Sequence, residues 1–173
     1  MLATAPKPAA AFSIRPATPA DADGIWEIFH EVISKGDTYV FAPDTSRADA
    51  DAYWLNPDAL NYVATRNTDG KILGAYVVRT NRPGLGSHVA NASYIVHAQA
   101  RGLGVGRALG EHAIATARNA GYKAMQYNFV VSTNEKAVAL WKSLGYSVIG
   151  TAPKGYQHAT LGLVDVLIMH RFL

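Results

Sequence analysis

The chain has 173 residues, of which 49% are hydrophobic, so it is long enough to bury the core of one domain. It contains no cysteine, which excludes a disulfide framework, a thiolate zinc site and a cysteine nucleophile. The net charge of +3 is mild and no basic run exists, so the composition gives no sign of nucleic-acid binding. No apolar stretch is long enough to span a membrane.

The first eleven residues are rich in alanine and proline. They lack the charged start and the long apolar centre of a secretion signal. We therefore expect a flexible tail over residues 1–11, a single domain over residues 12–173 and a cytoplasmic location.

The first predicted element is a short strand over residues 12–15. A capping signature at residues 18–21 begins a helix with apolar residues at helical spacing, which ends at Gly36. A second capping signature at residues 46–49 begins a short helix. Both helices precede the main run of strands.

Three strands are predicted next, over residues 61–66, 71–79 and 88–96. The first two flank residues 67–70, Asn-Thr-Asp-Gly, which have the composition of a hairpin turn. The three strands are therefore expected to form an antiparallel meander.

A predicted helix over residues 105–120 leads to a strand over residues 124–131. Such a crossover places the new strand parallel to the strand at residues 88–96. The remaining predicted elements are a helix over residues 134–144, a strand over 146–151, a long loop and a strand over 164–172. The order predicts an α+β fold with one α/β step in the middle.

A glycine loop joins the third strand of the meander to the following helix; it reads Arg101-Gly102-Leu103-Gly104-Val105-Gly106-Arg107. Glycines let backbone N–H groups approach a ligand closely, and a helix start adds positive potential, so the loop predicts a pyrophosphate site. A P-loop requires Lys-Ser/Thr after the last glycine, and a dinucleotide fingerprint requires glycine where Arg107 stands. A tight turn without a ligand is the remaining alternative, but three alternating glycines between two arginines favour a ligand.

Arg101, Gly104 and Gly106 match the acetyl-CoA motif Gln/Arg-x-x-Gly-x-Gly/Ala of the GNAT superfamily. Residues 134–146 match its second signature, a helix that begins Asn-x-x-Ala and ends in Gly-Phe/Tyr. The chain therefore resembles GNAT N-acetyltransferases over nearly its whole length from Phe12. The resemblance implies a mixed, mostly antiparallel twisted sheet, with a central parallel pair splayed around the cofactor and about four flanking helices.

The resemblance also implies acetyl-CoA as co-substrate, with no metal. The cofactor residues that it implies are Tyr94, Ile95 and Val96 of the strand, the seven loop residues Arg101 to Arg107, and Asn134 and Lys142. Many members carry a tyrosine in the second signature, which protonates the departing thiolate. Trp141 stands at that position, and an indole N–H donates a hydrogen bond but does not serve as a proton-transfer acid.

Two asparagines are candidates for the acceptor side. Asn91 lies in the strand before the loop, which has no carboxylate to serve as a base, and Asn128 lies in the next strand. Satisfied core amides are the alternative interpretation. With Asn134, the pair resembles a narrower group, the yeast-type acetyltransferase that acts on azetidine-2-carboxylate and related proline analogues. That resemblance implies catalytic and substrate-binding roles for Asn91 and Asn128.

The same resemblance implies that residues 37–44, with Tyr39 and Phe41, line the substrate pocket. Tyr156, in the predicted loop before the last strand, is our candidate for the missing acid. Asp165 interrupts an apolar strand, where hydrogen bonding to the backbone is the preferred interpretation.

We predict transfer of an acetyl group to a primary or secondary amine of a small molecule, an amino acid or an analogue, by direct attack in a ternary complex. The alternatives are a protein N-terminal or lysine acetyltransferase and a non-catalytic acyl-CoA-binding module. The resemblance also implies a homodimer formed through the last strands.

Overall fold

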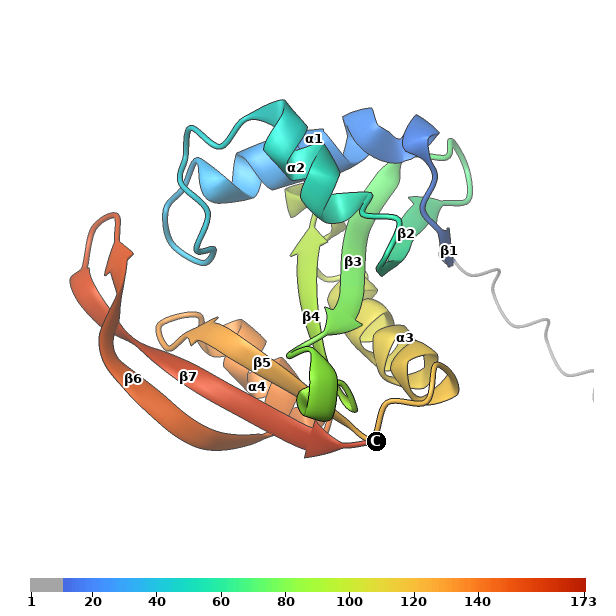
Figure 1. Cartoon of the computed structure of the whole chain (residues 1–173). Coiled ribbons are helices and arrows are strands. Elements are labelled where there is room, and N and C mark those ends of the chain that lie inside the picture. The colour runs from blue at the N-terminus through green and yellow to red at the C-terminus, as the bar shows by residue number, and fades with distance from the viewer. Residues whose placement is uncertain (1–10) are drawn as a thin grey trace, which may run out of the picture.

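The computed structural model describes residues 11–173, so the predicted tail lies almost wholly outside the described residues. These residues form one seven-stranded sheet in the order β1-β2-β3-β4-β5-β7-β6, with α-helices on both faces (Figure 1). The strands are β1 (Phe12–Pro16), β2 (Leu60–Arg66), β3 (Ile72–Thr80), β4 (Val89–Val96), β5 (Ala124–Val131), β6 (Ser147–His158) and β7 (Gly162–Phe172). The helices are α1 (Ala22–Ile33), α2 (Arg47–Trp54), α3 (Val105–Asn119) and α4 (Glu135–Ser143).

The strand pairing confirms the predicted topology. Strands β2, β3 and β4 form the antiparallel meander, and β1 adds to the free edge of β2. Within the described residues β4 and β5 are the only parallel neighbours, because α3 carries the chain back across the sheet between them. The mixed sheet and its flanking helices are those that the resemblance implied.

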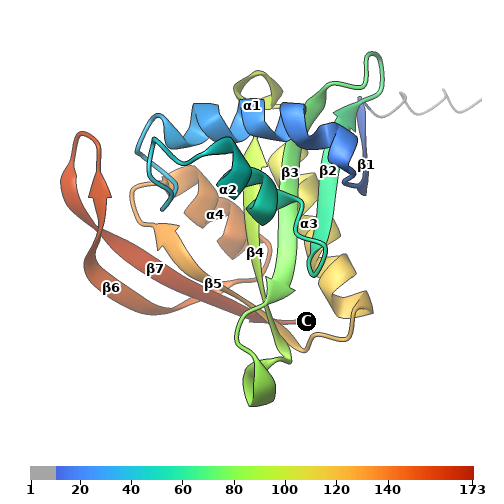
Figure 2. The same ribbon diagram turned by 45° about the horizontal axis from the view of Figure 1, so that its top comes forward.

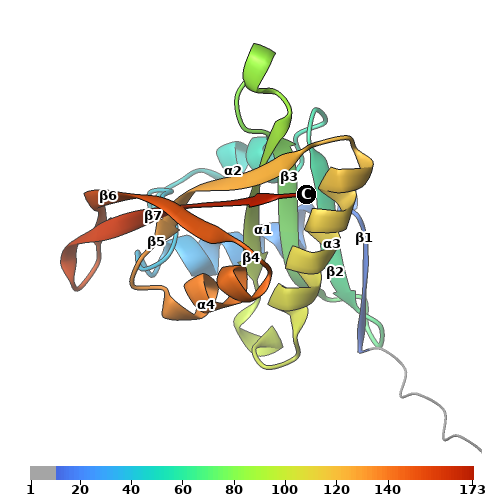
Figure 3. The same ribbon diagram turned by 90° about the horizontal axis from the view of Figure 1, so that it is seen from below.

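Each face of the sheet has its own core. Helices α1 and α2 cover one face, where Val63, Ala75 and Val77 are buried. Helices α3 and α4 cover the other face (Figures 2 and 3), where Leu73 and Tyr76 are buried. Strand β3 is therefore buried on both sides, which explains its unbroken apolar run. Side chains of β4 that alternate along the strand consequently face different helices.

The predicted long loop between the last two strands is wrong. It forms the far half of a hairpin, in which β6 and β7 stay paired as far as His158 and Gly162. Residues 152–155, Ala-Pro-Lys-Gly, have the composition of a loop, but they form an irregular stretch where the register shifts between Ala152 and Tyr156. Asp165 stabilises this stretch, because its carboxylate accepts a 2.9 Å hydrogen bond from the Lys154 backbone N–H. That contact confirms the predicted backbone role of Asp165.

Candidate active site

Strands β4 and β5 begin side by side and then separate (Figure 1). Their ladder holds only two residue pairs, Val89 with Ala124 and Ala90 with Met125. Beyond Ala90 a cleft of about 950 Å³ opens between the strands. Residues of β4, β5, the glycine loop, α4 and the segment between α1 and α2 line it. The cleft therefore passes from one face of the sheet to the other.

Asn91 is the first residue of β4 past the last pair. Its side-chain Nδ2 donates a 2.8 Å hydrogen bond to the backbone carbonyl of Gln126 on β5. This bond bridges the two strands at the point where the backbone ladder stops. Asn91 also lines the cleft. Its side chain therefore both bridges the two strands and forms part of the wall of the candidate site.

The glycine loop lies at the opposite end of β4. Gly102 and Gly104 have φ angles of +80° and +76°, a conformation that L-residues with side chains rarely adopt. No heavy atom lies within 4 Å of the position that a Cβ would take on either residue. Gly104 is the N-cap of α3 and offers no side-chain cap, so the first N–H groups of this helix are open to an anion. These features fit a pyrophosphate.

The side chains of the loop do not all turn toward the cleft. Arg101 lines it, together with Gly102 and Gly106. Val105 is buried in the core, and Leu103 is 49% exposed. Arg107 donates a 2.8 Å hydrogen bond to Ser143 Oγ, which ties α3 to α4. A ligand at this end would therefore meet backbone amides and one guanidinium.

Aromatic side chains line the middle of the cleft on the α3 and α4 face. The ring of Trp141 packs against those of Tyr94 and Tyr127, at centroid distances of 4.8 Å and 4.9 Å. The Tyr94 and Tyr127 hydroxyls lie 2.9 Å apart, and the Tyr127 hydroxyl donates to that of Tyr146 over 2.7 Å. Burial raises the pKa of Tyr94 and Tyr127 well above the ordinary value of a phenol. Both phenols are therefore neutral donors at physiological pH.

Helix α4 contributes the opposite wall. The Asn134 side-chain oxygen accepts a 3.3 Å hydrogen bond from the Ala137 backbone N–H, so Asn134 caps the helix and also lines the cleft. Lys142 is exposed and is not among the lining residues, whereas Lys136, the second residue of the helix, is. Sequence spacing did not distinguish the two lysines, because both lie close to signature positions. The remaining strand residues, Ile95 and Val96, both line the cleft.

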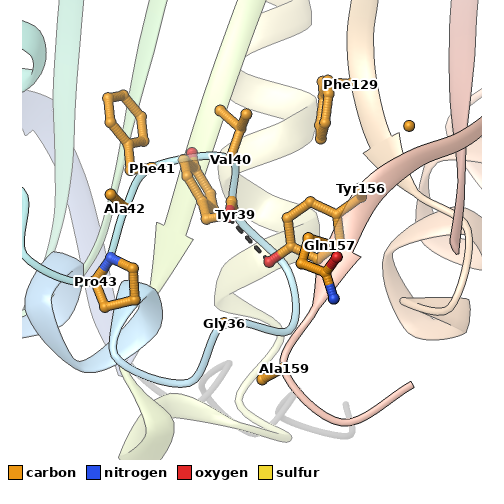
Figure 4. A pocket seen from close by; sticks show the side chains of 11 residues that line it. Gly36, Tyr39, Val40, Phe41, Ala42, Pro43, Phe129, Tyr156, Gln157 and Ala159 are labelled. Carbon is orange, nitrogen blue, oxygen red and sulfur yellow. Dashed lines mark hydrogen bonds between the residues drawn. The ribbon is translucent and has the colours of Figure 1, made fainter. Parts of the chain in front are cut away.

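On the α1 and α2 face the cleft meets a smaller pocket of about 420 Å³ (Figure 4). Tyr39 and Phe41, from the segment at residues 37–44 that was predicted to line a substrate pocket, line both spaces. Phe129 of β5 and Tyr156 of β6 complete the pocket. The walls of this pocket are mainly apolar and aromatic.

Tyr156 does not line the large cleft. Its hydroxyl donates a 3.1 Å hydrogen bond to the backbone carbonyl of Tyr39, as Figure 4 shows. A second bond, from Ala159 N–H to the Gly36 carbonyl over 2.9 Å, joins the same two segments. Burial raises the pKa of Tyr156, and the nearby Asp37 carboxylate adds to the effect. The hairpin tip of β6 and β7 is thus fastened to the segment between α1 and α2.

Asn128 lies across the cleft from β4. Its Nδ2 donates a 2.6 Å hydrogen bond to Asn81 Oδ1, and its own Oδ1 accepts one from Gln126 over 2.9 Å. Both asparagines predicted for the acceptor side therefore line the same cleft. Their side-chain amides stand on the face away from the buried tyrosines.

Within residues 11–173 no group of three or more His, Asp or Glu side chains is arranged to hold a metal ion. In the same part of the chain, no helix combines the length and the apolar character that crossing a membrane requires.

Comparisons with known proteins agree with this geometry. Residues 26–146 match the model of the acetyltransferase (GNAT) family. The N-acetyltransferase aca1 of Schizosaccharomyces pombe is 34% identical over 113 residues, in an alignment that covers 61% of this chain and 52% of that protein. The chain thus spans about half the length of this relative.

Solved structures show the same fold. A GCN5-related N-acetyltransferase from Kribbella flavida is 44% identical, with a TM-score of 0.90 over 94% of this chain and 98% of that one. A GNAT superfamily phosphinothricin acetyltransferase from Sinorhizobium meliloti, solved in complex with AcCoA, has a TM-score of 0.83 at 21% identity. It is matched over 94% of this chain and 89% of that one, and at this identity the likeness is one of fold.

Proposed function

Because the chain belongs to the GNAT acetyltransferase family, we propose that it transfers an acetyl group from acetyl-CoA to a primary or secondary amine of a small molecule, an amino acid or an analogue. The observation that carries the proposal is the cleft between β4 and β5. It joins the glycine loop, our candidate pyrophosphate site, to an aromatic pocket on the other face of the sheet. Donor and acceptor would therefore meet in the gap, in one ternary complex.

The donor is proposed to bind along β4. The open amides of the glycine loop and the start of α3 suit the pyrophosphate, and Arg101 adds a positive charge. Past Ala90, the β5 side of β4 has no neighbouring strand, so backbone groups at residues 94–96 are available to pantetheine. Asn134 would face the cofactor from α4 with its side-chain N–H₂, since its oxygen caps the helix.

The reaction joins the amine nitrogen to the acetyl carbon as the carbon–sulfur bond breaks. The proton lost by the amine ends, in net terms, on the released thiol. A backbone N–H of β4 would stabilise the oxyanion that develops on the carbonyl. We propose that Asn91 and Asn128 orient the amine or a water at the gap, since an amide positions a proton but does not accept it.

The departing sulfur needs a hydrogen-bond donor or acid. Trp141 occupies the position at which many family members have a tyrosine, and its indole stands against Tyr94 and Tyr127 in the cleft. Tyr156 stays our candidate acid, and its bond to the Tyr39 carbonyl gives it a second candidate role in holding the pocket shut.

The hydrogen bonds between the hairpin tip and the segment before α2 favour a small acceptor over a protein substrate. A peptide would have to lie between the hairpin tip and the segment before α2, where Tyr156 and Ala159 already bond to that segment. A protein acetyltransferase is therefore the second candidate, and a non-catalytic acyl-CoA-binding module the third.

We also propose a homodimer and a cytoplasmic location. Strand β6 is an edge of the sheet, and Val148 and Ile149 on it are 39% and 59% exposed. An apolar edge strand is a surface on which a second copy can pair. Light scattering on the purified protein checks the dimer, which a monomer at micromolar concentration would contradict.

The test of function is a CoA-release screen with acetyl-CoA and a panel of amino acids, proline analogues, polyamines and peptides. We expect release with at least one amino acid or analogue and none with peptides. Efficient turnover of peptides alone would support the second candidate. Acetyl-CoA binding without release by any amine would support the third.

A further inference from the structure

One cationic side chain in the cleft has no assigned role. Arg79, near the end of β3, lines the cleft. Within residues 11–173 it has no carboxylate partner. The two carboxylates that line the same cleft are Asp37, which accepts a hydrogen bond from the neighbouring Thr38 hydroxyl, and Glu135 on α4. Arg79 is therefore a guanidinium held at the cleft without a counter-ion from the described chain.

The side chain of Tyr53 fixes the direction of this guanidinium. Its central carbon lies 4.4 Å from the centroid of the Tyr53 ring, and Nη2 donates a 2.8 Å hydrogen bond to the Tyr53 hydroxyl. That hydroxyl in turn lies 2.6 Å from Ser93 Oγ on β4. A stacked and tethered guanidinium is pre-organised, so it loses little rotamer freedom when it binds an anion. Its other N–H donors have no partner among the described residues.

Arg79 lies too far from the glycine loop to bind the pyrophosphate of the cofactor. Arg79 stands directly opposite Asn91 in the β3–β4 ladder, at the narrow end of the cleft. The glycine loop begins beyond Val96. Asn91 and Val96 are separated by about 16 Å of strand, at about 3.3 Å per residue, so Arg79 and the loop lie at different ends of the cleft. Opposed residues on one sheet face have Cβ atoms roughly 5 Å apart. Arg79 is therefore a neighbour of the amide proposed to orient the acceptor amine.

We propose that Arg79 binds a carboxylate of the acceptor, which makes the acceptor an α-amino acid or a close analogue rather than a simple amine. The assignment rests on the proposed acetyl transfer. The planar fork of arginine matches a carboxylate in a bidentate geometry, and an adjacent amine then lies toward Asn91. Phe41 packs against Tyr53 at 4.9 Å between ring centroids and continues into the aromatic pocket. That pocket suits an apolar side chain of the same amino acid.

The experiment compares each amino acid with its own carboxamide. The pairs are azetidine-2-carboxylate, proline, alanine, leucine and phenylalanine with their amides, at saturating acetyl-CoA. The wild-type protein is expected to show a kcat/KM about 100-fold higher for the best acid than for its amide. Arg79→Gln is expected to lose about 100-fold on the acid while the amide changes less than about threefold. Arg79→Lys, which keeps the charge without the fork, is expected to recover part of the loss.

Arg82→Gln is the matched control, because Arg82 is an exposed arginine close to Arg79 in the chain and does not line the cleft. It should keep the wild-type ratio of acid to amide. Circular dichroism and the affinity for acetyl-CoA should be unchanged in both glutamine variants. Tyr53→Phe, which removes the tether of the guanidinium, is expected to lower the ratio by about tenfold.

Equal losses on acid and amide in Arg79→Gln would show a structural role and overturn the proposal. So would a wild-type protein that acetylates amides or simple amines as well as acids, a result that leaves the acetyltransferase function standing. A protein that binds acetyl-CoA in a titration but releases CoA with no amine would instead refute the proposed function, and with it the role of Arg79 as an acceptor anchor.

Discussion

The two ends of the cleft differ in how the chain builds them. At the proposed donor end, residues 101–107 form one continuous stretch in which backbone amides and a helix start are open to a ligand. The acceptor end gathers side chains from α2, β3, β4, β5, β6 and the segment at residues 37–44. Backbone recognition depends on conformation and leaves the other side chains of the stretch free to pack elsewhere, as Val105 and Arg107 do. Side-chain recognition depends on identity at each position.

This contrast has a consequence for specificity. Substitutions at the proposed acceptor end should change what is acetylated without affecting cofactor binding, whereas the proposed donor end should tolerate few changes because its glycines are required for conformation. Mutations at one end should therefore impair either acetyl-CoA binding or use of the acceptor, but not both.

The largest effect is expected from Gly104→Glu. A carboxylate at the helix start opposes the pyrophosphate, so the affinity for acetyl-CoA should fall by more than about 100-fold. Isothermal titration calorimetry measures the loss. Gly70→Glu is the matched control, since Gly70 has a similar φ of +73° and equally open space but lies in the turn between β2 and β3. Retained affinity in Gly104→Glu would refute the loop assignment.

Asn91→Ala should break the acceptor end alone. The loss of the bridge to the Gln126 carbonyl and of the orienting amide should lower kcat by about 10- to 100-fold, with acetyl-CoA affinity within about threefold of wild type. Steady-state CoA release measures the change. Asn61→Ala removes a comparable side-chain bond to the Asn56 carbonyl outside the cleft and should leave kcat unchanged. Unchanged turnover in Asn91→Ala would remove Asn91 from catalysis.

Tyr156→Phe should have the smallest effect and decides between its two roles. If the hydroxyl only holds the pocket shut through Tyr39, KM for the acceptor should rise by up to about tenfold while kcat stays within about threefold. This is the result that we expect from the placement of Tyr156. Tyr122→Phe, which loses a bond to Thr80 outside the cleft, is the control.

The pH dependence of kcat tests the other role of Tyr156, that of a general acid. The pKa of Tyr156 is raised by burial, so its phenol stays protonated through neutral pH and would lose its proton only above the ordinary value of about 10. An acid role would give a fall of kcat above that pKa in the wild type. Loss of this alkaline fall in Tyr156→Phe, with a large drop of kcat, would establish Tyr156 as the acid.

The local features of the cleft could be predicted from the sequence more readily than its long-range contacts, for a physical reason. The glycine loop and the cap at Asn134 are local, because their conformation is set by residues a few positions away. The acceptor side depends on long-range contacts: Arg79 meets Tyr53 across 26 residues and Tyr53 meets Ser93 across 40. No periodicity or spacing encodes such contacts.

The hairpin of β6 and β7 shows the same limit. Proline and glycine at residues 153 and 155 predicted a loop, yet pairing with β7 resumes at Tyr156 after the irregular stretch. A tertiary ladder overrode the local signal there. The lysines of α4 add a finer case, since the residue that faces the cleft is Lys136 rather than Lys142.

The brief ladder between β4 and β5 also bears on how the protein is kept folded. An open sheet ordinarily has two edge strands. Here β4 and β5 stop pairing past Ala90, so the facing sides of these two strands are also unpaired edges, inside the molecule. A bound pantetheine would form hydrogen bonds with backbone groups that have no partner strand there, so the cofactor would help to stabilise the sheet. At a concentration 100 times its dissociation constant, a ligand stabilises the folded state by about 2.7 kcal/mol. The lifetime of such a protein in a cell would then depend on the supply of acetyl-CoA. A low acetyl-CoA concentration would lower the amount of folded enzyme as well as its rate.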